Sequence, residues 1–329
     1  MTSFSDISGQ ERIKKQLKDA VKYDKISHAY IFCGDKGSGK KLTARTFAAT
    51  IQCEKGGTEP CGECHSCRMA ATDNHPDIIT VRHEKPNSIS VGEIREQLVS
   101  DVGIKPYSGK KKIYIVPDAE KMTSEAQNAI LKTIEEPPEY AVIMLLTQNR
   151  EQLLPTILSR CAVISMKPVS DEVVEKYLET ELDIAEERAR TYAAFAHGNI
   201  GQAMEMASSE KYSEMMDFTL ECMKKIRDMG AADIAASVKS MTDYKDSISD
   251  ILDIMLLWFR DILVCKGGCG AGLTFTNEKG YIERESERCG YEGLENIINS
   301  ISAARAEYKA SVSFEPVTEL LLIKIHDNI

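Results

Sequence analysis

Short apolar runs alternate with helical patterns through the first half of the chain. Five runs predict strands because each stops at a polar or glycine-rich segment: Ala29–Cys33, Asp77–Val81, Lys112–Val116, Ala141–Leu146 and Ala162–Ser165. Helices are expected around an amphipathic stripe of Ile13, Leu17 and Val21, and at Lys41–Ile51, Val91–Val99 and Thr123–Glu135. Strands that alternate with helices predict an α/β fold whose parallel sheet is covered on both faces.

The pattern changes after Pro168, and the rest of the chain is predicted to be helical. Ser170 precedes a helical segment and is expected to be its N-cap. Breaks in the helical pattern come at His197–Asn199 and at Lys266–Gly272. We therefore expect three domains: an α/β domain at 1–165, a small helical domain at 166–207 and a larger all-α domain at 208–329.

Length and composition fit a globular protein outside membranes. The chain has 329 residues, of which 43% are hydrophobic and 28% are charged, so it can bury a large core. Its longest apolar runs, Ala141–Leu146 and Ile254–Phe259, have six residues, whereas crossing a bilayer takes ~20. Asp6 and Glu11 lie where a signal peptide would be apolar. A cytoplasmic location with no membrane partner is expected.

Charge is distributed unevenly between the two halves. Residues 1–164 hold 23 Lys and Arg against 21 Asp and Glu, whereas residues 165–329 hold 18 against 30. The first half is therefore close to neutral and the second carries a net charge of −12. Because nucleic acids are polyanions, any contact with them is expected from the first half.

A glycine-rich segment follows the first predicted strand and resembles a phosphate loop. Residues 34–41 match the pattern G-x-x-x-x-G-K-[ST] at every fixed position except the last. Gly34, Gly37 and Gly39 would let backbone N–H groups curl around phosphates, and the following helix would add a favourable dipole. Lys40 would reach the β- and γ-phosphates of a nucleotide.

The residues expected to hold magnesium beside this loop are altered. Lys41 takes the place of the Ser or Thr that coordinates the ion. The strand Lys112–Val116 should end in an Asp–Glu pair, but Pro117 and Asp118 follow it. One alternative is a shift of register that makes Asp118 the metal-side acid. ATP binding remains possible, whereas two separate changes in one site predict that hydrolysis is lost.

Four cysteines gather just after the predicted phosphate-loop helix. Cys53, Cys61, Cys64 and Cys67 offer the four thiolates of a tetrahedral zinc site, and the glycines between them permit sharp turns. A site with four sulfur ligands is closed, so its zinc would be structural. An iron–sulfur cluster is the alternative, although a ferredoxin-type fourth cysteine lies downstream rather than upstream. Cys265 and Cys269 have no second pair nearby and are expected to be free thiols.

Several motifs in the same order resemble the AAA+ clamp-loader subunits of bacterial DNA polymerase III. They are Ser27–Tyr30, the four-cysteine insert at 53–67, Asn128–Pro138, Thr147 and Leu158–Cys161. The resemblance covers most of residues 1–205, and beyond it only helical character and the pattern Val317–Ile325 match. It implies an AAA+ P-loop domain, then a helical lid, then an all-α collar that holds subunits together in a ring.

The resemblance also implies how such a chain works. An active ATPase subunit of the tau/gamma type would keep Ser or Thr at position 41 and an Arg near position 201, where this chain has Gly201. Arg160, in an intact Ser-Arg-Cys motif, is implied to act in trans as an arginine finger on the ATP of a neighbouring subunit. The implied partners are tau/gamma ATPase subunits, the delta subunit, the sliding clamp and, through the assembled ring, primer–template DNA.

Two other functions fit parts of the sequence. The chain could be an active tau/gamma-type ATPase only if hydrolysis proceeds despite Lys41, Pro117 and Gly201. A small-molecule kinase with a phosphate loop would leave the Ser-Arg-Cys motif and the cysteine insert without a role. A measurement of ATP hydrolysis by the isolated protein would distinguish the active ATPase from a subunit whose own ATP site is degenerate.

Overall fold

The computed structural model describes residues 3–268, 272–310 and 312–329. These residues form two compact units. The first runs to Val173 and includes Gly198–Gln202, and the second holds Val174–His197 and the chain from Ala203 onward. Cys269, one of the two expected free thiols, lies outside the described residues.

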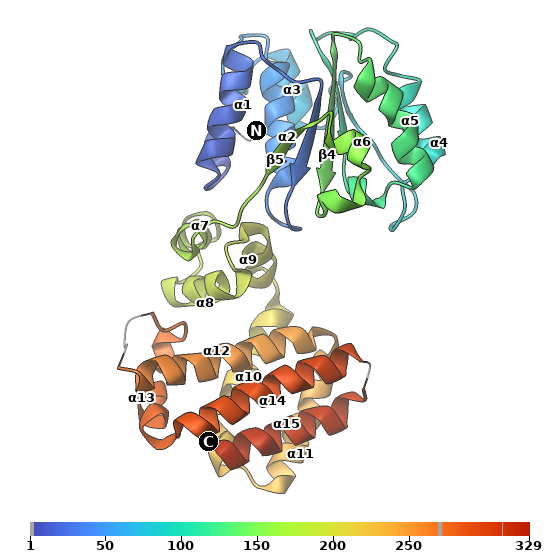
Figure 1. The fold of residues 1–329 in the computed structure, drawn as a ribbon. Helices are drawn as coiled ribbons and strands as arrows, with labels where there is room; N and C mark the ends of the chain where they lie inside the picture. The colour runs from blue at the N-terminus through green and yellow to red at the C-terminus, as the bar shows by residue number, and fades with distance from the viewer. Residues whose placement is uncertain (1–2, 269–271, 311) are drawn as a thin grey trace. The chain divides into compact units, whose positions relative to one another are not determined.

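A five-stranded parallel sheet forms the centre of the first unit (Figure 1). Its strands are β1 (Ala29–Cys33), β2 (Ile78–Thr80), β3 (Lys112–Val116), β4 (Ala141–Thr147) and β5 (Ala162–Ser165). The order across the sheet is β2-β3-β4-β1-β5, so β1 lies between β4 and β5 although both follow it by more than a hundred residues. All five predicted strands are present, and the predicted parallel sheet is confirmed.

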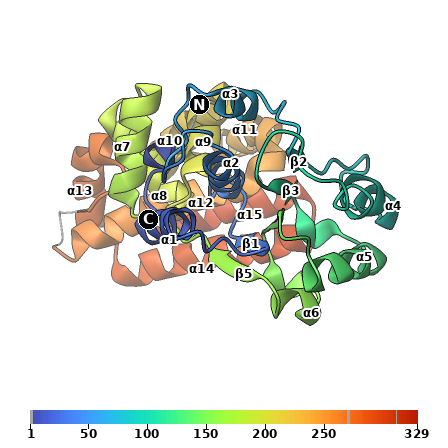
Figure 2. The ribbon, with the colours of Figure 1, turned by 90° about the horizontal axis from the view of Figure 1, so that it is seen from above.

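Helices cover both faces of this sheet, as Figures 1 and 2 show. One face packs against α1 (Glu11–Lys22) and α2 (Lys40–Ile51) through Leu17 and Phe47, which are fully buried. The opposite face packs against α4 (Val91–Ile94), α5 (Ser124–Glu135) and α6 (Pro155–Leu158). The helix predicted at Val91–Val99 is divided, because a π turn at Arg95–Val99 follows α4.

Local capping explains where several of these helices begin. The Thr123 side chain accepts a hydrogen bond from the Ala126 N–H at 3.2 Å and starts α5. Ser90 and Glu93 form a reciprocal capping box that starts α4. These helices frame the carboxyl edge of the sheet, where ligands bind in open parallel sheets.

Beyond Ser165 the described residues contain helices and no strand. The helices are α7 (Asp171–Leu182), α8 (Glu186–Ala196), α9 (Ile200–Ala207), α10 (Glu210–Lys225), α11 (Ala231–Met241), α12 (Ile248–Lys266), α13 (Lys279–Arg288), α14 (Tyr291–Lys309) and α15 (Phe314–Asn328). The predicted break at His197–Asn199 is confirmed, because His197 and Gly198 both have positive φ angles.

The core of the second unit forms around α12, which contacts α10, α13 and α14. Trp258 and Phe259 of this helix are fully buried. Asp261 is also fully buried, and its carboxylate accepts hydrogen bonds from the N–H groups of Thr274 and Phe275 at 2.7 and 2.9 Å. None of the described helices combines the length and apolar composition required to cross a membrane.

Candidate functional site

The phosphate loop connects β1 to α2 with the geometry expected from its glycines. Gly37 and Gly39 have φ angles of +85° and +86°, and residues other than glycine rarely adopt φ angles in this region. A Cβ on Gly34 would lie 2.8 Å from the Cβ of Met166. The backbone path and the packing therefore both require small residues, and Lys40 is placed in the first turn of α2.

The ammonium group of Lys40 turns back onto its own loop. It donates hydrogen bonds to the carbonyl oxygens of Gly34 and Asp35, the second at 2.8 Å. Burial lowers the pKa of Lys40, and nearby groups led by the Glu120 carboxylate act in the opposite direction. A bound phosphate would compete with these two carbonyls for the ammonium group. Lys41 is exposed on the first turn of the same helix.

Two acidic residues follow β3 at this edge of the sheet. Asp118 has a positive φ of 48° and forms an ion pair with Lys121 at 3.1 Å. Glu120, which sequence reasoning missed, has a buried carboxylate oxygen with no hydrogen-bond partner in the described part of the chain. Its position just beyond a strand end, where parallel strands direct polar groups to one edge, is the signal that could have found it.

The segment Gly198–Gln202 lies against the outside of the phosphate loop. The Gly201 N–H donates to the Gly37 carbonyl oxygen at 3.1 Å, and the Asn199 side-chain N–H donates to the Lys36 carbonyl oxygen at 2.7 Å. A Cβ on Gly201 would lie 2.5 Å from that Gly37 oxygen. Gly201 therefore meets the loop through its backbone, and a larger residue would not fit this arrangement.

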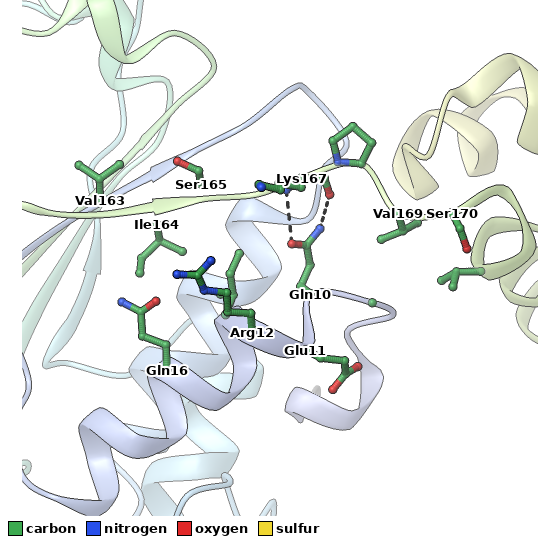
Figure 3. A pocket seen from close by; sticks show the side chains of 14 residues that line it. Gln10, Glu11, Arg12, Gln16, Val163, Ile164, Ser165, Lys167, Val169 and Ser170 are labelled. Carbon is green, nitrogen blue, oxygen red and sulfur yellow. Dashed lines mark hydrogen bonds between the residues drawn. The ribbon is translucent and has the colours of Figure 1, made fainter.

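A cavity of about 510 Å³ opens between the start of α1 and the outer edge of β5. Figure 3 shows the Gln10 side chain crossing it to the backbone of Lys167. The Gln10 amide donates to the Lys167 carbonyl oxygen, and its own oxygen accepts from the Lys167 N–H at 3.4 Å. This bridge fixes the segment that follows β5. The Arg12 side chain also lines the cavity, where it is exposed.

Arg160 lies between α6 and β5, on a different part of the first unit. One of its terminal nitrogens donates to the Thr156 carbonyl oxygen and to the Ser159 hydroxyl, both at 3.1 Å. The other forms an ion pair with Glu135 at 3.1 Å. None of its contacts within the described residues reaches the phosphate loop, so the structure brings Gly34, Gly37, Gly39 and Lys40 together and leaves Arg160 apart.

The four predicted cysteines form one cluster. The sulfur atoms of Cys53, Cys61, Cys64 and Cys67 all lie within 4.8 Å of one another. Glycines with positive φ at 56, 57 and 62 make the turns between them. A short helix that the sequence did not predict, α3 (His65–Ala71), carries Cys67. Its N-cap is Cys64, whose sulfur accepts the Cys67 N–H at 3.3 Å.

The electrostatics of the cluster suit a cation. Hydrogen bonds from the N–H groups of Cys64 and Glu63 lower the pKa of Cys61 to about 6. Burial raises the pKa of the Cys67 thiol to about 12, so without a positive charge this thiol stays protonated. A divalent ion would reverse that preference by binding the thiolate. Four sulfurs in reach of one point therefore fit a metal with soft ligands.

Side chains around the cluster connect it to β2. Glu54 accepts the Ser66 N–H at 2.9 Å, and the Ser66 hydroxyl lies 2.8 Å from His75 Nε2. Nδ1 of His75 accepts the Asp77 N–H at 3.0 Å, so the proton of this imidazole is on Nε2 and faces Ser66. Burial lowers the pKa of His75, which keeps the ring neutral.

Comparison with known proteins agrees with this geometry. A family model described as DNA polymerase III, delta subunit, matches residues 9–170. The delta-prime subunit of DNA polymerase III from Bacillus subtilis is 28% identical over 97% of this chain and 96% of its own length. The tau subunit from the same organism is 27% identical over 98% of this chain and 61% of its own length. Escherichia coli tau is 34% identical over 62% of this chain and 32% of its own length.

Solved structures give two further likenesses. A DNA polymerase III gamma subunit-related protein from Thermotoga maritima aligns with 97% of this chain and 98% of its own, at 18% identity and a TM-score of 0.43. The clamp-loader delta protein of Bacillus subtilis aligns with 95% of this chain and 99% of its own, at 13% identity and a TM-score of 0.37.

The sheet order, the phosphate loop and the helical region after it define an AAA+ P-loop protein. The matches to delta-prime and tau extend along nearly the whole chain. By sequence, the chain is similar to the delta-prime and tau subunits of DNA polymerase III.

Proposed function

We propose that the chain is a clamp-loader subunit of the delta-prime type. It would join tau/gamma ATPase subunits and the delta subunit in a ring that loads the sliding clamp onto primer–template DNA in the cytoplasm. The 28% identity to a delta-prime relative along 97% of this chain supports this assignment, as do Lys41, Pro117 and Gly201, which depart from an active tau/gamma-type site. Residues 166–207 would serve as the lid and residues 208–329 as the collar that holds the ring together.

The nucleotide site of the chain itself would be degenerate. Lys41 removes the hydroxyl that holds magnesium, and Pro117 removes the first acid. Gly201 supplies no side chain to a γ-phosphate and lies against Gly37 instead. Gly34, Gly37, Gly39 and Lys40 could still bind ATP, but slow or absent hydrolysis follows from three changes in one site.

The contribution to catalysis would come from Arg160 in trans. Its side chain is about two-fifths exposed, and within the described residues it contacts Thr156, Ser159 and Glu135 and not the phosphate loop of this chain. The observation that carries the proposal is an exposed guanidinium that is oriented by Thr156 and Ser159 and, among the described residues, makes no contact with the phosphate loop of its own chain. Placed beside the γ-phosphate of a neighbour, it would stabilise the charge that develops during transfer.

A structural zinc ion would occupy the cysteine cluster. Cys53, Cys61, Cys64 and Cys67 would supply all four ligands and leave no open position for catalysis. Zinc is favoured over an iron–sulfur cluster because the fourth cysteine, Cys53, lies upstream of the other three, whereas a ferredoxin-type fourth cysteine lies downstream. The ion would hold the insert at 53–67 against α2.

An active ATPase of the tau/gamma type remains the second candidate function. The observation that favours it is Glu120, whose unpartnered carboxylate oxygen and effect on the pKa of Lys40 place an acid near the phosphate loop. Glu120 could then replace the acids missing at 117–118. This candidate predicts magnesium-dependent turnover by the chain alone.

Turnover measurements on the chain alone and in the loader test the proposal. The purified chain should show no magnesium-dependent ATP hydrolysis, and turnover that is lost in Glu120→Gln would establish the second candidate. In a loader reconstituted with its ATPase and delta subunits, Arg160→Ala should lower the rate at the adjoining site by about 10³–10⁵-fold. Arg150→Ala is the matched control, because Arg150 is exposed and nearby. An unchanged rate in the Arg160 variant would refute the role in trans.

A further inference from the structure

Arg160 already has an anionic partner within its own chain. Glu135, at the end of α5, places a carboxylate oxygen 3.1 Å from a terminal nitrogen of the guanidinium. The Arg160 and Glu135 side chains are 40% and 45% exposed, so water and a neighbouring molecule can reach both. Glu136, the next residue, is also exposed but makes no such contact.

The hydrogen bonds of the guanidinium divide into two sets. Both hydrogens of one terminal nitrogen point to neutral acceptors, the Thr156 carbonyl and the Ser159 hydroxyl. The other terminal nitrogen gives one hydrogen to Glu135. Because a guanidinium has five N–H donors, two remain for an external acceptor. The neutral acceptors fix the orientation of the group, and Glu135 alone opposes its charge.

We propose that Glu135 is a positioning residue for the donated arginine. It holds the Arg160 guanidinium while the neighbouring nucleotide site is empty, and it gives up the guanidinium to the triphosphate when nucleotide binds there. This inference rests on the proposed role of Arg160 in trans. Thr156 and Ser159 keep their contacts during the exchange, so the guanidinium changes its anion without changing its direction.

The charges involved explain why the exchange runs toward the triphosphate. An exposed carboxylate–guanidinium pair contributes little, because solvent and salt screen it. A triphosphate carries several negative charges and accepts paired hydrogen bonds from a guanidinium. If Glu135 kept its contact, its carboxylate would lie close to the γ-phosphate, and the two anions would repel each other. Glu135 therefore competes with the nucleotide for Arg160.

The test uses a reconstituted loader in which the ATPase subunits lack their own finger arginines, so that only the site facing this chain is complete. Glu135→Gln should tighten the Kd of a fluorescent, slowly hydrolysed ATP analogue about two- to fivefold, the range set by an exposed ion pair. The value of kcat should stay within about twofold. Glu135→Asp should restore most of the original Kd, and Glu136→Gln, which removes the same charge without the contact, should leave it unchanged.

A double variant separates competition from other effects. Glu135→Gln should have no effect on Kd in the Arg160→Ala background, because the two residues act through one contact. An unchanged or weaker Kd, or a fall in kcat alone, would overturn the inference. If Arg160→Ala lowers turnover while Glu135→Gln leaves Kd unchanged, only this inference fails. If Arg160→Ala has no effect, the proposed function fails together with it.

Discussion

Replacing Gly201 with alanine should destabilise the first unit, although the same change normally strengthens a helix. Gly201 is the second residue of α9, and exchange of glycine for alanine inside a helix gains up to about 1 kcal/mol. Here the new Cβ would lie 2.5 Å from the Gly37 carbonyl oxygen and 2.6 Å from the Gly37 Cα. Relieving such an overlap by backbone shifts costs about 1–3 kcal/mol. Subtracting the gain from this cost leaves a net loss of up to about 2 kcal/mol.

Hydrogen exchange gives a local measurement of this loss. Because the chain has two units, its global unfolding need not be two-state. Peptides that cover residues 34–41 and 198–204 should exchange faster in Gly201→Ala, because the hydrogen bond from the Gly201 N–H to Gly37 is weakened. The matched control is Gly280→Ala, which changes the second residue of α13 where no atom lies within 4 Å of the new Cβ. If both variants keep the original protection, the close approach of Gly201 to the loop is wrong.

Two further predictions concern the cysteine cluster and its surroundings. Elemental analysis of the purified chain should find about one zinc ion. The variant Cys67→Ala should lose this ion, whereas the control Cys222→Ala, which removes a buried cysteine outside the cluster, should retain it. Iron with visible absorbance would favour an iron–sulfur cluster instead. Burial raises the pKa of Asp77, but hydrogen bonds from the N–H groups at 107–109 outweigh burial and hold that pKa below its usual value. The stability this carboxylate contributes is thus complete above about pH 4 and lost as the pH falls through the folded pKa. Asp77→Asn should lower the free energy of unfolding by about 2–4 kcal/mol at pH 7 and by much less in acid. The matched control is Asp246→Asn, because Asp246 is exposed. A loss that does not change with pH, or an equal loss in the control, would contradict this prediction.

The strands and the cysteine cluster could be predicted because their signals are local in sequence. The apolar runs at Lys112–Val116 and Ala141–Leu146 coincide with β3 and with nearly all of β4, since buried parallel strands have few polar positions. The cysteine spacing likewise limits how far apart the four sulfurs can lie. By contrast, α3 begins inside the insert, where a serine and a histidine between cysteines give no periodic pattern.

The contacts that shape the site could not be predicted, because they join residues far apart in the chain. From the sequence, Gly201 was noted only because an active ATPase would have an arginine near this position. Its backbone contact with Gly37 depends on the path of the chain after β5. Glu135 lies in the motif Asn128–Pro138, but its pairing with Arg160 depends on how α5 and α6 pack on the sheet. Glu120 was not predicted, because it lies beyond positions 117 and 118, where the acids that hold a metal were expected.

The phosphate loop and Arg160 occupy separate elements, and this separation has a consequence for how such subunits can diverge. Residues at the loop, such as Lys41 and Gly201, make no hydrogen bond or ion pair with Arg160 or Glu135 in the described part of the chain. A duplicated gene can therefore accumulate changes around one without disturbing the other. Under the proposed function, the ability to bind a nucleotide and the ability to assist a neighbouring subunit could therefore change independently of each other.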